Sequence, residues 1–89
     1  MRILIADDDR VSLRLLGKHL LKLGHEVVSV GDGAAAMETL KKECLDIAII
    51  DWMMPGLDGI EVCRRLRKSN EDRYVYVILL TAKAGSGDV

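Results

Sequence analysis

Three aspartates and a threonine stand directly after apolar runs in this 89-residue sequence. Asp7 and Asp8 follow the first run, Asp51 follows the third, and Thr81 follows the last. Clustered carboxylates repel one another unless a cation joins them, and a small set of hard oxygen ligands suits Mg²⁺. A nucleophilic carboxylate beside Mg²⁺, with a hydroxyl to hold a phosphoryl oxygen, makes a phosphoryl-acceptor site. These residue types therefore predict phosphoryl chemistry, provided that the fold brings them together.

The apolar runs have the length and composition of buried strands, and segments of helical periodicity separate them. The predicted strands cover residues 3–6, 26–30, 47–50 and 75–80, and the predicted helices cover residues 11–23, 33 to about 43, and 59 onward. This alternation is typical of right-handed βαβ units, a parallel sheet and helices on both of its faces. Such sheets carry their chemistry outside the carboxyl ends of the strands, which is where the four polar residues fall.

Aspartates also have a structural use, because their side chains cap helix N-termini. Any of the three aspartates at 7–9 could cap the first helix, and we predict that Asp9 does so. Asp32 and Asp58 are the predicted caps of the next two helices, and Gly24 is the predicted stop of the first. Asp51 taken alone could be a turn residue. For the third helix we expect one buried face formed by Ile60, Cys63 and Leu66.

The composition excludes several classes of protein. Thirteen basic and fourteen acidic side chains leave a formal net charge of −1, and no basic stripe predicts direct contact with nucleic acid. Cys44 and Cys63 are far apart in sequence, without a CxxC pair, so we expect buried thiols rather than a disulfide or metal site. We find no signal peptide and no apolar run long enough to cross a membrane. We therefore expect a cytoplasmic protein with no membrane contact.

Three segments resemble the signature segments of the receiver domains of two-component response regulators. They are the strand leading into Asp7-Asp8-Asp9, the stretch Asp51-Trp52-Met53-Met54-Pro55-Gly56-Leu57-Asp58-Gly59, and the run Leu79-Leu80-Thr81-Ala82-Lys83. The resemblance covers essentially the whole chain. It implies an α/β, flavodoxin-like, doubly wound parallel sheet of strand order 2-1-3-4, from which the family's fifth strand and last two helices are missing.

The resemblance also implies a role for each matching residue. Asp51 accepts a phosphoryl group from a sensor histidine kinase or a phosphotransfer protein. Asp8 and Asp51 bind Mg²⁺ directly, Asp7 acts mostly through water, and the backbone carbonyl of Met53 supplies another ligand. Thr81 is the switch hydroxyl that moves to the phosphoryl group. The implied function is a phosphorylation switch in signal transduction, not an enzyme.

The departure from the family lies at the end of the chain. Receiver domains carry an invariant lysine after a fifth strand, and Lys83 is not that lysine because it follows the fourth predicted strand by only a few residues. We interpret residues 1–89 as a single truncated receiver domain, whether the truncation is natural or engineered. Residues 74–80 would then form an exposed, uncharged sheet edge, and we expect homo-oligomers that associate through this strand.

Two other functions remain open. The chain could be an interaction module that truncation has left unable to accept a phosphoryl group. It could also be a small phosphohydrolase with an aspartate nucleophile, but that class usually has a second carboxylate two residues after the nucleophile. Met53 stands at that position.

Overall fold

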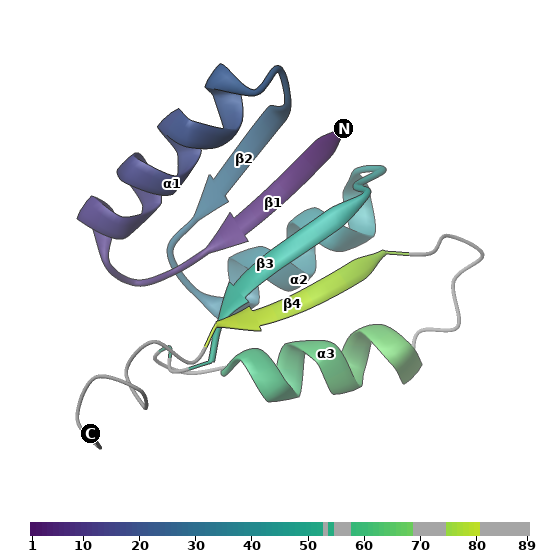
Figure 1. Ribbon diagram of the computed structural model, residues 1–89. Coiled ribbons are helices and arrows are strands. Elements are labelled where there is room, and N and C mark those ends of the chain that lie inside the picture. The colour runs from purple at the N-terminus through teal and green to yellow at the C-terminus, as the bar shows by residue number, and fades with distance from the viewer. Residues whose placement is uncertain (53, 55–57, 69–74, 81–89) are drawn as a thin grey trace.

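The computed structural model describes residues 1–52, 54, 58–68 and 75–80 (Figure 1). Strands and helices alternate along this part of the chain, as predicted. In order they are β1 (Arg2–Ala6), α1 (Arg10–Lys22), β2 (Glu26–Val30), α2 (Gly33–Lys42), β3 (Ile47–Asp51), α3 (Gly59–Lys68) and β4 (Tyr76–Leu80). Each lies within about two residues of its predicted boundaries.

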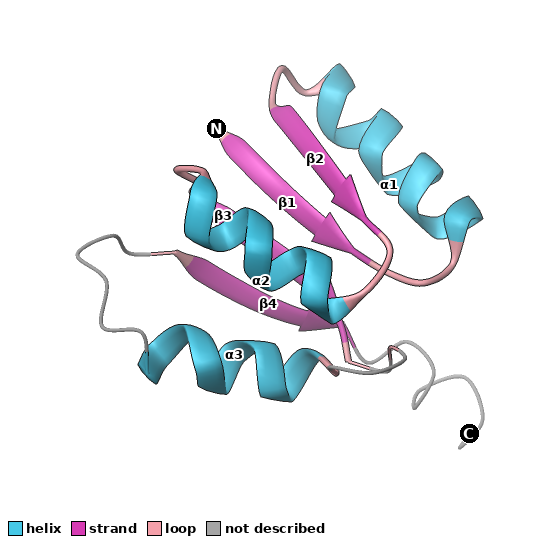
Figure 2. Cartoon of the chain, turned by 180° about the vertical axis from the view of Figure 1, so that it is seen from behind, coloured by secondary structure: helices cyan, strands magenta, loops and turns pink. Residues whose placement is uncertain are grey.

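The strands form one parallel sheet in the order β2-β1-β3-β4, which confirms the predicted fold. Helix α1 packs on one face of the sheet against β1 and β2, whereas α2 and α3 lie together on the other face (Figures 1 and 2). The connection through α1 places β2 on one side of β1, and the connection through α2 places β3 on the other side. The direction in which strands are added therefore reverses between β1 and β3. The carboxyl ends of β1 and β3 therefore meet at the centre of one sheet edge.

Half of the buried apolar residues in the described part of the chain belong to the two central strands. Helices α2 and α3 lie over one face of the sheet, and α1 packs on the other face of β1. Alternate residues of β1 and β3 point toward α2 and α3, where Leu4, Ala48 and Ile50 are fully buried. On the α1 side, Ile3 and Ile5 are buried as well. Full burial of an aliphatic side chain of this size stabilises the fold by about 1.5–3 kcal/mol. The strands that carry the aspartates are thus the most firmly held part of the sheet.

Local signals fix the helix ends as the sequence predicts. The amide of Val11 donates to Asp9 Oδ1 at 3.1 Å, so Asp9 is the cap of α1 and Asp7 and Asp8 are left for other roles. Asp32 and Asp58 cap α2 and α3 in the same way, accepting from the amides three residues ahead at 2.7 Å and 2.8 Å. Each cap satisfies a backbone donor that would otherwise have no partner within its helix.

Two sequence predictions about side-chain burial are wrong. The inward face of α3 is formed by Gly59, Val62 and Leu66, while Ile60 is 38% exposed and Cys63 lies at the edge of the buried face. Cys44 is exposed, because it follows the end of α2 in the connection to β3. Neither thiol is fully buried, although the two cysteines form no disulfide, as expected.

Two glycines of the first βαβ unit should respond in opposite ways to replacement by alanine. A Cβ on Gly17 would lie 3.6 Å from Ile5 Cδ1, which is ordinary van der Waals contact, so Gly17→Ala should stabilise the protein by about 0.5–1 kcal/mol through higher helix propensity. Gly24 has φ +92°, so Gly24→Ala should destabilise it by about 1 kcal/mol, although nothing lies within 4 Å of the new Cβ. Urea unfolding measures both effects. Equal signs for the two variants would contradict this account of α1.

Candidate functional site

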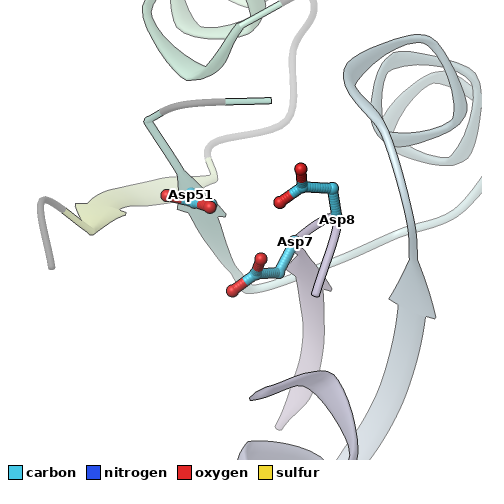
Figure 3. Close-up of side chains that lie close together, drawn as sticks. All are labelled: Asp7, Asp8 and Asp51. Carbon is cyan, nitrogen blue, oxygen red and sulfur yellow. The ribbon is translucent and has the colours of Figure 1, made fainter. Parts of the chain in front are cut away.

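Strand pairing brings the predicted site residues together at the carboxyl edge of the sheet. Ala6, the last residue of β1, is paired with Ile50, so the chain positions that follow, Asp7 and Asp51, are neighbours across the sheet. Asp8 comes next in the loop toward α1. Figure 3 shows the three carboxyl groups converging, and each offers an oxygen within 4.8 Å of the others.

The three carboxyl groups differ in their access to solvent. Asp51 is only 5% exposed and is the buried charged residue of the described core. Asp7 is half-buried, and Asp8 is exposed at the mouth of the cluster. This gradient leaves one side of the cluster open to water while the Asp51 carboxylate lies against the protein. It is a suitable geometry for a small ion that keeps part of its hydration shell.

The pKa of the Asp7 carboxyl is raised in this cluster. Burial raises the pKa of the Asp7 carboxyl above its ordinary value of 3.8, and the charge of Asp51 and a hydrogen bond with its carboxyl raise the pKa further. The amide of Asp9 donates to Asp7 Oδ1 at 2.9 Å, and this hydrogen bond lowers the pKa in opposition. Burial and the neighbouring negative charge therefore favour the neutral form of Asp7 more than water does.

The donor set fits a magnesium ion. Three carboxylates supply hard oxygen ligands, and Mg²⁺ uses one or two carboxylates together with water. A divalent cation would offset the mutual repulsion of the three carboxylates. Among the predicted site residues, Asp7, Asp8 and Asp51 are brought together, whereas Met53 and Thr81 lie outside the described residues.

Two backbone hydrogen bonds hold the segment just after the acceptor position. The amide of Trp52 donates to the carbonyl of Leu80 in β4 at 3.0 Å, and the amide of Gly59 donates to the carbonyl of Trp52 at 3.0 Å. The end of β3 is therefore tied to β4 on one side and to the start of α3 on the other. The sequence predicted neither hydrogen bond, because each joins residues that no local pattern relates.

Replacing Asp7 with Asn should stabilise the metal-free protein at neutral pH. The raised pKa means that the folded state holds the Asp7 proton more tightly than the unfolded state. Stability is therefore lost as the pH rises from about 3.8 through the raised pKa, and it stays lower above that value. In EDTA at pH 7, Asp7→Asn should melt several degrees higher than the wild type, and the difference should vanish below pH 3.8. A wild type that gains stability relative to the variant as the pH rises would contradict the assigned repulsion.

Comparisons with known proteins agree with this geometry. Residues 3–89 match the model of the response regulator receiver domain family. The chain is 40% identical to the response regulator PleD of Caulobacter vibrioides over 87 residues, which are 98% of this chain and 19% of PleD. Its fold is similar to the receiver domain of the sensor histidine kinase PA1611 from Pseudomonas aeruginosa, with magnesium coordinated in the active site cleft. There the TM-score is 0.86, the identity is 33%, and 98% of this chain and 71% of that chain are covered.

A second solved structure contains a kinase partner. The chain is similar to the structure of the response regulator TrrA of Thermotoga maritima in complex with the histidine kinase ThkA, at a TM-score of 0.80 and 36% identity, covering 91% of this chain and 68% of that chain. The chain spans 19% of the length of PleD and 38% of the length of the transcriptional regulatory protein TctD of Salmonella typhimurium. The sheet order, the position of the aspartates and these similarities agree, and the chain belongs to the family of response regulator receiver domains.

Proposed function

We propose that this domain accepts a phosphoryl group on Asp51 and acts as a phosphorylation switch. The observation that carries the proposal is the convergence of three carboxylates around a buried Asp51 at the switch point of a parallel sheet. Asp51 comes from a rigid central strand, whereas Asp7 and Asp8 come from the loop beside it. This difference favours Asp51 as the nucleophile and the other two as supporting ligands.

The cofactor that we propose is Mg²⁺. Asp8 and Asp51 would bind it directly, Asp7 would act through water, and the backbone carbonyl of Met53 would complete the protein's contribution. When bound, the ion neutralises negative charge on the carboxylates and on the phosphoryl oxygens. The similarity to the PA1611 receiver domain, whose structure contains magnesium, supports this assignment.

The chain's own residues perform the remaining steps. A carboxylate oxygen of Asp51 attacks the phosphorus in line, and the nitrogen of the donor's phosphohistidine leaves with the bonding electron pair. The product is an acyl phosphate on Asp51. We propose that the hydroxyl of Thr81 then binds a phosphoryl oxygen and so reports the modification to the rest of the domain. The chemistry needs little more than positioning and charge neutralisation.

We propose a sensor histidine kinase or a phosphotransfer protein as the donor, in the cytoplasm. The structure of TrrA bound to ThkA supports a kinase partner for a similar domain. A partner could reach the site beside α1, because Val11 and Leu15 are exposed on that helix soon after Asp8. None of the helices in the described segments is long and apolar enough to span a membrane.

Phosphorylation and metal binding can be tested together, and the test separates this function from the alternatives. Trp52 is 37% exposed and adjacent to Asp51, so its fluorescence should change when Mg²⁺ binds. A small phosphodonor should then label one residue per chain, with no label in Asp51→Asn and at least tenfold weaker Mg²⁺ binding in Asp8→Asn, as is roughly expected for a lost ligand. Turnover beyond one equivalent would favour a phosphohydrolase, and no response to donor or metal would favour an interaction module.

We also propose that the chain associates through β4. Within the described residues β4 pairs only with β3. Tyr76 and Ile78 are 75% and 47% exposed on the same face of the sheet as α1, which covers only β1 and β2 there. An apolar strand with one free edge favours pairing with another copy.

Sedimentation should therefore show a dimer or larger species at high micromolar concentration, and Ile78→Lys should shift the equilibrium toward monomer. Exposed Ile60, which lies on α3, is the matched control, and Ile60→Lys should leave the association unchanged. A wild type that stays monomeric at these concentrations would contradict the proposal.

A further inference from the structure

Gly59 lies closer to the acceptor strand than any residue with a side chain could. A Cβ built on Gly59 would lie 2.8 Å from the carbonyl oxygen of Asp51 and 3.1 Å from Trp52 Cα. Both are backbone atoms, and both distances are shorter than van der Waals contact allows. The third close atom, Leu79 Cδ2 at 3.1 Å, belongs to a side chain that can rotate away.

Conformational freedom does not explain the glycine at this position. Gly24 is the described glycine with a positive φ, and Gly59 begins an ordinary α-helix. Alanine has a higher helix propensity than glycine, so local preference alone would favour a side chain here. Space is the remaining reason, because the first turn of α3 packs directly on the backbone of Asp51 and Trp52.

The backbone on either side of this contact has little room to yield. The amide of Trp52 donates to Leu80, and the amide of Gly59 donates to the carbonyl of Trp52, so a displacement would stretch one hydrogen bond or the other. Asp51 itself is buried. A methyl group at position 59 would therefore push the end of β3 away from α3 by a few tenths of an ångström and carry the Asp51 carboxylate with it.

We infer that Gly59 is a positioning residue, which sets the distance between α3 and the backbone of Asp51 and thereby the placement of the Asp51 carboxylate against Asp7 and Asp8. It acts through the acceptor's main chain and touches neither metal nor phosphoryl group. The inference rests on the proposed function for its consequence, because Mg²⁺ demands nearly ideal geometry and tolerates little error in the position of a ligand.

The test compares Gly59→Ala with Gly31→Ala, a matched control, because nothing lies within 4 Å of a Cβ on Gly31. Backbone amide NMR shifts in the metal-free protein give a first readout that does not depend on the proposed function. Gly59→Ala should move the amide signals of Asp7 and Asp8, which lie in the loop after β1 and are not among the atoms nearest to a Cβ on residue 59. Gly31→Ala should leave the Asp8 signal in place, and Asp8 is the position that decides, because the Asp7 amide donates to the carbonyl of Val30 beside Gly31. Changes confined to α3 and its immediate contacts would overturn the inference.

Metal binding and labelling give a second readout by calorimetry and with a small phosphodonor. Gly59→Ala should bind Mg²⁺ about tenfold more weakly, the size of effect typical of residues that orient a ligand, and should label more slowly even at saturating Mg²⁺. Wild-type affinity and rate in the variant would overturn the inference. If the wild type itself neither binds metal nor is labelled, the proposed function fails, and the NMR result still decides the role of Gly59.

A double variant separates positioning from simple packing and guards against loss of folding. In Gly59→Ala/Leu79→Val the side-chain clash is removed, but the contacts with the Asp51 and Trp52 backbone remain. The double variant should recover stability against urea while the Mg²⁺ affinity stays reduced. If both the stability and the Mg²⁺ affinity of the double variant returned to the values of Leu79→Val alone, the clash with the Leu79 side chain would explain the whole effect. The positioning role of Gly59 would then be wrong.

Discussion

The pairing of β1 with β3 holds negative charges together against their mutual repulsion, and the site depends on this one constraint. The two strands are joined along residues 3–6 and 47–50. The apolar side chains of β1 are buried on both faces of the sheet, and those of Ala48 and Ile50 in β3 are buried on the face toward α2 and α3. That burial offsets the cost of gathering three carboxylates whose oxygens lie within 4.8 Å of one another. The fold therefore maintains an arrangement that is unfavourable by itself and becomes favourable when a cation or a proton is bound.

Asp51 adds a second constraint, because a buried aspartate has few ways to adjust. Asp51 is 5% exposed, at the end of a central strand, and the chain after it is tied to both β4 and α3. A carboxylate on an exposed loop would find a metal by moving toward it. This one is placed by its neighbours, and the start of α3 packs directly against its backbone.

The two faces of the sheet are unequally covered in the described residues. The face toward α2 and α3 contains the main core, whereas α1 covers only β1 and β2 on the other face. Ile78 and Tyr76 are exposed for this reason, although their partners on β3, Ile49 and Ile47, are half-buried. The same strand is thus well packed on one face and open on the other, which a pattern of apolar residues does not reveal.

Much of the molecule follows from local sequence. Apolar runs of strand length, helical periodicity and the capping aspartates predicted every described element and the three helix caps, because these features depend on residues close together in the chain. The choice of Asp9 as a cap left Asp7 and Asp8 for the site, and the parallel alternation placed Asp51 beside them. The inward face of α3 was predicted wrongly, since Ile60 and Val62 both fit an apolar stripe and only the position of the sheet selects Val62.

Sequence alone therefore determined the helices and strands and the identity of the clustered carboxylates. The order of the strands in the sheet followed from the resemblance to a family. Tertiary structure alone decided how deeply each carboxylate is buried, which one raises its neighbour's pKa, and how closely α3 approaches Asp51. These quantities depend on contacts between residues far apart in the chain. The local sequence around Gly59 indicates an ordinary helix start. Only the tertiary structure shows that a Cβ at this position would lie 2.8 Å from the carbonyl oxygen of Asp51.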